Sequence, residues 1–196
     1  MFNPKDFYFR KAKQEWYKAR SIFKLEEINN KFKIITHKTL NILDIWCAPW
    51  SRVQYIEKIT NDKTKIIWID IKETNINSKK IKCYIQDATD LNWIENILKK
   101  NKIDKLDIIT SDVAPNTIWF KDIDAIRSIE LIKTTLPIYE NFLKLNWKFV
   151  IKVFMWPWFD NLIKEIKKQY WWKNIKTFKP QAVRKISKEI YIIKYI

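Results

Sequence analysis

Short apolar runs and amphipathic stretches alternate along this chain. Apolar runs of strand length predict strands over residues 41–45, 65–70, 81–85, 106–110 and 148–154, with one more in 175–180 and one in 184–196. Apolar residues at helical spacing predict helices over residues 5–31, 51–59, 90–100, about 124–144 and 159–170. Strands that alternate with helices favour an α/β fold with a mostly parallel sheet flanked by helices.

Acidic residues lie in or directly after three of these predicted strands. Asp44 lies in the first strand, Asp70 ends the second and Asp87 follows the third. Open α/β sheets bind ligands at the carboxyl ends of their strands, next to the unpaired N–H groups of the following helix. Asp70 lies about twenty residues beyond the turn at 47–50, where nucleotide-binding units place a carboxylate on ribose hydroxyls. The pattern predicts a nucleotide cofactor and resembles the cofactor half of a class I methyltransferase more than that of a dehydrogenase.

Glycine is absent from the chain, whereas tryptophan occurs 11 times. At an average of about 7% glycine, about a dozen would be expected. Several tryptophans stand where glycine normally permits a turn or a close approach to a ligand: Trp46, Trp50, Trp147, Trp156 and Trp158. We hypothesise that UGA codons meaning glycine have been read as tryptophan, which UGG codons at positions 46 and 50 would contradict. The alternative is a tryptophan-rich protein from a skewed genome, and a real indole could pack at Trp93, Trp171 or Trp172.

Length and charge narrow the class of protein. With 196 residues and 47% hydrophobic content, we expect one domain over 1–196, with a basic helical extension at 1–35 packed on it. An excess of 38 Lys+Arg over 22 Asp+Glu predicts a polyanionic partner, although a lysine-rich genome would produce the same excess. Without a signal peptide or a membrane-spanning run, we expect a cytoplasmic monomer. Cys47 and Cys83 suggest neither a disulfide nor a metal site, and His37 is expected at the surface.

Lys152 interrupts the apolar strand 148–154. A lysine in such a strand is costly unless it is paired or has a function. We therefore take Lys152 as a candidate functional residue. The alternative is a lysine on an edge strand that extends its ammonium group to solvent.

Five segments of the chain resemble, in the right order, the FtsJ family of S-adenosylmethionine-dependent RNA ribose 2′-O-methyltransferases. They are residues 11–25, 43–50, 111–116, 150–154 and 187–191. The resemblance implies a Rossmann-like class I methyltransferase fold with a mostly parallel, seven-stranded sheet. It also implies a catalytic tetrad at Lys24, Asp112, Lys152 and Glu189. The S-adenosyl-L-methionine positions fall on Asp44, Cys47, Ala48, Pro49, Trp50, Arg52, Asp70, Asp87 and Asp112, with no metal implied.

The chain departs from this family at two kinds of position. Tryptophan replaces the family glycine at positions 46, 50, 147, 156 and 158, and an indole at 50 would fill the methionine part of the cofactor pocket. Arg52 stands where bacterial ribosomal members have an aromatic residue.

Methyl transfer from a sulfonium to a ribose hydroxyl is an in-line displacement in which positioning dominates. The hydroxyl must lose its proton as it attacks. Lys152 in its neutral form could accept that proton, and burial beside the cation Lys24 favours this form. Asp112 and Glu189 are then expected to hold the two ammonium groups in place. The residues alone leave open which lysine is finally neutral.

A basic face on the first helical segment and a basic loop near the end of the chain are expected to bind RNA phosphates. They contribute Lys11, Lys13, Lys18, Arg20, Arg184 and Lys185. The alternative for the helix is an ordinary solvated face. By family analogy we expect the target to be a uridine of 23S ribosomal RNA, in the assembled large subunit.

Several other functions stay open or are disfavoured. A transfer RNA 2′-O-methyltransferase and a non-catalytic basic RNA-binding module both stay open. An amino-methyltransferase would carry Asn/Asp-Pro-Pro-aromatic after the fourth strand, where this chain has Asp112-Val-Ala-Pro. A hemolysin-like methyltransferase would carry an RNA-binding domain for which the 40 residues before the first strand leave no room.

Overall fold

The computed structural model describes residues 6–46, 51–71, 76–113, 121–155, 159–170 and 174–195. A seven-stranded sheet of order β3-β2-β1-β4-β5-β7-β6 forms its middle layer. The strands are β1 (Asn41–Ile45), β2 (Lys65–Asp70), β3 (Ile81–Ile85), β4 (Leu106–Ser111), β5 (Leu143–Phe154), β6 (Ile175–Phe178) and β7 (Glu189–Lys194). Strands β1 to β5 pair in parallel, and β7 runs antiparallel to both β5 and β6. The prediction of a mostly parallel, seven-stranded sheet is confirmed.

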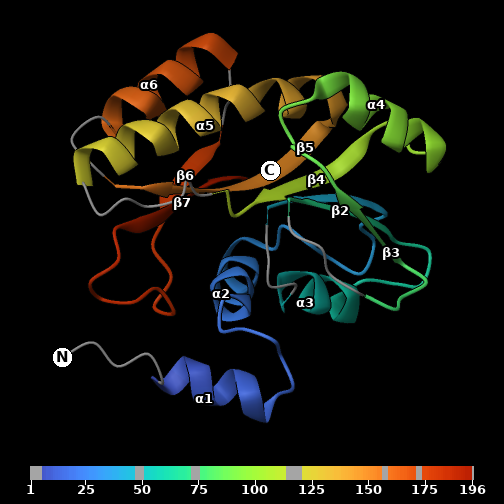
Figure 1. The fold of residues 1–196 in the computed structure, drawn as a ribbon, viewed down its shortest axis with the longest axis horizontal. Coiled ribbons are helices and arrows are strands. Elements are labelled where there is room, and N and C mark those ends of the chain that lie inside the picture. The colour runs from blue at the N-terminus through green and yellow to red at the C-terminus, as the bar shows by residue number, and fades with distance from the viewer. Residues whose placement is uncertain are drawn as a thin grey trace.

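Helices cover both faces of this sheet (Figure 1). One face carries α4 (Leu91–Lys100), α5 (Lys121–Phe142) and α6 (Phe159–Tyr170). The other carries α2 (Ile22–Phe32) and α3 (Ser51–Ile59), with α1 (Phe7–Gln14) beyond them. None of the helices in the described part of the chain is long and apolar enough to cross a membrane.

Alternation along the strands divides the apolar core into two layers. Ile42 packs in the layer beneath α2 and α3, whereas Leu43 and Ile45 pack in the layer beneath α4, α5 and α6. Val150 likewise belongs to the α2 and α3 layer. Because side chains two positions apart share a face of a strand, Asp44 and Lys152 face α2 and α3 as well.

The structure differs from the predicted elements in two places. The single helix predicted over residues 5–31 is two helices, because the chain turns at Trp16 with a left-handed φ of 61°. Strand β5 begins at Leu143, directly after α5, rather than at residue 148. Its pairing with β4 shifts between Leu106 and Ile108, which accommodates the additional residues in β5.

The described residues with a left-handed φ are Trp16, Lys33, Trp46, Lys102 and Asn174. This conformation is unfavourable for a bulky side chain and suits glycine. Moreover, within the described residues no acceptor lies within hydrogen-bond distance of the buried Nε1 atoms of Trp46 and Trp68. These features support the glycine hypothesis at position 46 and extend it to 16 and 68. Positions 50, 156 and 158, and the side chain of Trp147, lie outside the described residues.

Candidate active site

The carboxyl ends of the parallel strands bring the predicted acids to one edge of the sheet. In β1, Ile45 pairs with Ile69 of β2 and Ser111 of β4, so the residues after these strands lie side by side. Backbone hydrogen bonds extend the pairing by one step: Asp112 N donates to Ile45 O at 3.2 Å, and Gln86 N donates to Asp70 O at 3.0 Å. Asp44, Asp70, Asp87 and Asp112 therefore gather at the carboxyl edge. The predicted cofactor residues Cys47, Ala48, Pro49 and Trp50 lie outside the described residues.

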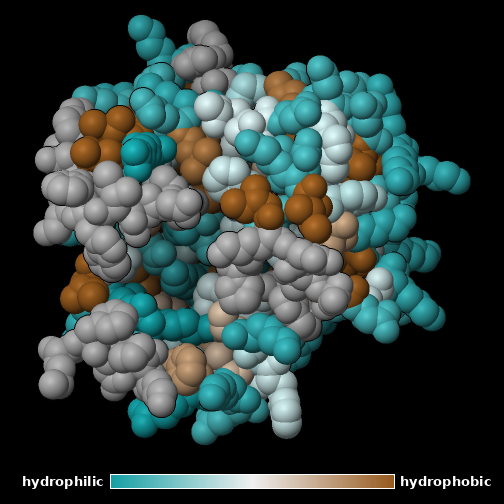
Figure 2. Space-filling model, viewed as in Figure 1, coloured by the Kyte–Doolittle hydropathy of each residue, from teal (hydrophilic) through white to brown (hydrophobic). Residues whose placement is uncertain are grey.

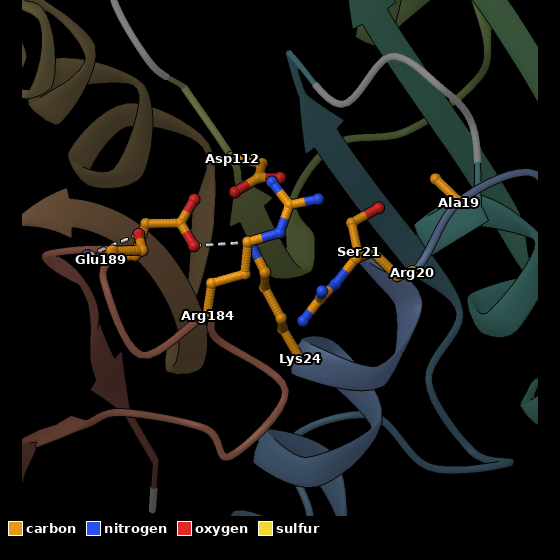
Figure 3. Close-up of a pocket in the computed structure, with 8 residues that line it drawn as sticks. Ala19, Arg20, Ser21, Lys24, Asp112, Arg184 and Glu189 are labelled. Atoms are coloured by element: carbon orange, nitrogen blue, oxygen red, sulfur yellow. Dashed lines mark hydrogen bonds and ion pairs between the residues drawn. The ribbon is translucent and has the colours of Figure 1, made fainter. Parts of the chain in front are cut away.

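A cavity of about 260 Å³ lies beside Asp112. Its lining residues are Ala19, Arg20, Ser21, Lys24, Asp112, Arg184, Ser187 and Glu189. Figure 3 shows Lys24 from α2, Asp112 from the end of β4 and Glu189 from the start of β7 converging on this cavity. The hollow is visible in Figure 2 among hydrophilic side chains. Three members of the predicted tetrad thus line one cavity, although they are far apart in sequence.

Lys24 and Glu189 form a close ion pair in this cavity. The distance from Lys24 Nζ to Glu189 Oε2 is 2.6 Å, and the two side chains are 13% and 15% exposed. Glu189 is held by its own loop, because its backbone N–H donates to Ser187 Oγ at 3.2 Å. A charge-assisted hydrogen bond of this length, largely shielded from water, holds α2 against β7.

Lys152 forms a second ion pair at the floor of the site. Its Nζ donates to the main-chain O of Asp112 at 2.7 Å and lies 3.1 Å from Oδ1 of the same residue. Strand β5 lies between β4 and β7, and Lys152 is only 6% exposed. The alternative of a lysine on an edge strand that reaches solvent is therefore wrong.

Arg52 connects Asp112 to the first strand. Its Nη2 lies 3.1 Å from Asp44 Oδ1, and its Nη1 lies 3.8 Å from Asp112 Oδ2. Asp44 is fully buried and also accepts a hydrogen bond from Thr110 Oγ1. Burial alone would raise the pKa of Asp112, but the charges of Lys152, Arg52 and Lys24 lower it from 3.8 to about 2. Asp112 is therefore an anion at neutral pH.

Tyr191 lies beside Lys152 and Asp112, and the sequence pattern did not identify it. It pairs with Lys152 across β5 and β7, and it is buried. Burial and the charges of Asp112 and Glu189 raise its pKa well above 10, so it keeps its proton. The alternation in β7, with Ile190 and Ile192 on the opposite face, was the only available signal in the sequence.

The start of α2 is anchored to the rest of the molecule by short polar contacts. Ser21 Oγ lies 2.7 Å from Ser51 Oγ, at the start of α3. Glu27 accepts hydrogen bonds from the backbone N–H groups of Gln181 at 2.6 Å and Ala182 at 2.9 Å. These contacts fix Lys24 relative to both the start of α3 and the loop before β7.

The predicted RNA-binding residues fall into three groups. Arg20 and Arg184 line the cavity, and both pair with Asp6. Lys13, Lys18 and Lys185 are exposed. Lys11, with its Nζ 3.6 Å from Glu15 Oε1, instead lines a neighbouring groove formed by α1, α2 and β6. The structure thus places two of the six cations beside the tetrad.

The sheet order, the antiparallel β7 and the acids at the carboxyl edge define a Rossmann-like class I methyltransferase. Comparison with known sequences narrows this class further. The profile of the FtsJ-like methyltransferase family matches residues 17–195, and the chain belongs to that family.

Similar proteins agree with this assignment. A ribosomal RNA large subunit methyltransferase E of Bdellovibrio bacteriovorus is 38% identical over 98% of this chain and 96% of its own length. A protein of the same name from Methanocaldococcus jannaschii is 35% identical over 96% of this chain and 77% of its own. A crystal structure of a ribosomal RNA methyltransferase of Plasmodium falciparum covers 91% of this chain and 97% of its own, with 25% identity and a TM-score of 0.77.

Proposed function

We propose that this protein transfers a methyl group from S-adenosyl-L-methionine to the 2′-hydroxyl of a uridine ribose in large-subunit, 23S ribosomal RNA. The convergence of Lys24, Asp112 and Glu189 on one cavity, with Lys152 paired to Asp112, carries this proposal. The name shared by its relatives supports the choice of large-subunit RNA. In this proposal residues 1–196 act as one domain, and residues 1–35 form an extension that supplies Lys24 and Arg20.

The carboxyl edge of the sheet suits a nucleotide donor. Asp70 and Asp87 follow neighbouring strands, where carboxylates can accept hydrogen bonds from ribose and base. Trp46 is unfavourable at this edge for two reasons. It has a left-handed φ of 49°, and its buried indole N–H lacks an acceptor among the described residues. Glycine at position 46 would remove both problems and leave space for the donor. The donor, when bound, supplies an activated methyl group on its sulfonium.

The tetrad residues have distinct parts in the proposed reaction. As the O–C bond forms at the ribose oxygen, the S–C bond would break with its electron pair left on sulfur, and the hydroxyl proton would pass to the Nζ of Lys152 in its neutral form. Asp112, held as an anion, stabilises the ammonium group that forms. Lys24, fixed by Glu189, orients the ribose.

The RNA backbone would lie over the cations at the cavity rim. Arg20 and Arg184 line the cavity, and the exposed Lys18 and Lys185 extend the positive surface outward. Phosphate contacts of this kind position the RNA but carry no sequence information. We therefore expect binding that weakens steeply with salt.

The test compares three RNA substrates under identical conditions. Protein made with glycine at the tryptophan positions is incubated with labelled donor and assembled large subunits, naked 23S RNA or transfer RNA, and 2′-O-methyl uridine is quantified. We expect methylation of the large subunit and at least tenfold less of transfer RNA. Preferred methylation of transfer RNA would favour the alternative substrate, and donor binding without transfer to any RNA would reject the proposed function. The protein with tryptophan throughout is the matched comparison, and we expect it not to bind the donor.

A further inference from the structure

We propose that Arg52 is a positioning residue that makes Lys152, rather than Lys24, the proton acceptor. This inference rests on the proposed function and deepens it. Arg52 would do so by sharing Asp112 with Lys152, so that Lys152 has no carboxylate of its own, whereas Lys24 has Glu189.

The guanidinium of Arg52 is built into the interior of the site. Arg52 is 3% exposed and lies in the first turn of α3. Its two terminal nitrogens face different acids, Asp44 at 3.1 Å and Asp112 at 3.8 Å. Asp44, which is fully buried, offsets part of the positive charge of Arg52. A planar, permanently charged group can hold two carboxylates in this way, and a lysine could not do so as well.

The two lysines therefore differ in the charges that surround them. Lys24 faces Glu189 at 2.6 Å. Lys152 faces Asp112 at 3.1 Å, and the same carboxylate also faces Arg52. Asp112 thus lies between two close cations, and Arg52 repels the ammonium group of Lys152, whereas Arg20 interacts with Glu189 only at longer range.

Arg52 also keeps Asp112 ionised after Lys152 has lost its proton. The groups that face Asp112 come from four elements: Lys152 on β5, Arg52 on α3, Lys24 on α2 and Tyr191 on β7. Arginine stays charged at all accessible pH values. If Lys152 were the only close cation, a buried Asp112 would tend to take up a proton whenever Lys152 became neutral. With Arg52 in place, Asp112 stays an anion and is ready to stabilise the ammonium group that Lys152 becomes.

The experiment measures the titration of the two lysines and the rate of methyl transfer separately. Nitrogen-15 spectra of the lysine Nζ atoms follow Lys152 and Lys24 against pH in the parent, Arg52→Met, Arg52→Lys and Lys58→Met proteins. Lys58 is a cation on the same helix and outside the tetrad cavity, so Lys58→Met is the matched control. The rate of methyl transfer at saturating donor is measured over the same pH range.

In Arg52→Met we expect the titration midpoint of Lys152 to move to higher pH, and that of Lys24 to move less. The rate at saturating donor should fall by about 10- to 100-fold, with its acidic limb shifted the same way. Arg52→Lys should restore part of the shift, and Lys58→Met should match the parent. An unmoved Lys152 midpoint, or a loss confined to the donor KM, would overturn the inference.

A fallback variant and a readout that needs no turnover complete the experiment. If Arg52→Met fails to fold because Asp44 is left unpaired, the double variant Asp44→Asn/Arg52→Met removes both buried charges and serves in its place. The spectra need no turnover, so an inactive parent would reject the proposed function while the Lys152 midpoint still decides the role of Arg52.

Discussion

Two lysine–carboxylate pairs lie at this site, yet their surroundings differ. Lys24 and Glu189 meet at 2.6 Å and join segments 165 residues apart. Lys152 and Asp112 meet at 3.1 Å within the sheet, and Asp112 is also drawn to Arg52. The two lysines therefore differ in the number of cations that lie close to their carboxylate partners.

The pairs also differ in how they are built. The Lys24–Glu189 pair depends on the docking of α2 against α3, through Ser21 and Ser51, and against the loop before β7, through Glu27 and residues 181–182. The Lys152–Asp112 pair is fixed by strand register, since β4 and β5 are hydrogen-bonded neighbours. We expect the first pair to be sensitive to changes in the N-terminal helices and the second to be nearly insensitive to them.

The largest expected effect is on the rate of methyl transfer, and it distinguishes the roles of Lys152 and Lys24. Lys152→Ala removes the proposed proton acceptor, so methyl transfer should fall by about 10³-fold or more while donor binding persists. Lys24→Ala should cost about 10- to 100-fold, because it removes positioning but not proton acceptance. Single-turnover rates at saturating donor, with calorimetry for donor affinity, measure both. Equal losses, or a larger loss for Lys24→Ala, would assign the acceptor role to Lys24.

The second prediction removes the carboxylate partner of Lys24. Glu189→Gln leaves Lys24 without its dedicated carboxylate, and we expect the rate to fall by about tenfold through loss of ribose positioning. The same variant should weaken the docking of α2, with a loss of about 1 kcal/mol in unfolding free energy. Thermal unfolding and turnover are measured on one preparation. A rate unchanged from the parent would show that the 2.6 Å pair is structural only.

Strand periodicity and acids at strand ends predict most of the fold from the sequence alone. The sheet, the two-sided helix layers and the edge that holds Asp44, Asp70 and Asp112 all follow from local patterns. Local patterns also predicted a paired or functional Lys152, because its cost in an apolar strand is a property of the strand itself.

Contacts between distant segments could not be predicted in the same way. Arg52 was expected among the cofactor residues, but its contact with Asp112 depends on how α3 packs against the sheet. The break at Trp16 was missed because a tryptophan gives no signal for a left-handed turn, whereas a glycine would have given one. The roles of Ser21 and Tyr191 likewise depend on packing rather than on spacing.

The smallest expected effect concerns stability in acid and tests whether Asp112 is shared as described. Its folded-state pKa of about 2 lies below its ordinary 3.8, so the stabilisation is fully present above about pH 4 and is lost as the pH falls toward 2. The difference corresponds to about 2 kcal/mol. Urea unfolding at pH 7, 4 and 3 should show a decline in stability for the parent that is smaller in Asp112→Asn by about 1 kcal/mol at pH 3, where about half of the difference has been lost. Arg52→Lys, which keeps the charge, should decline like the parent. A decline in Asp112→Asn as steep as that of the parent would mean that other carboxylates dominate the acid response, and that the cations around Asp112 hold it less firmly than the 3.1 Å and 3.8 Å contacts imply.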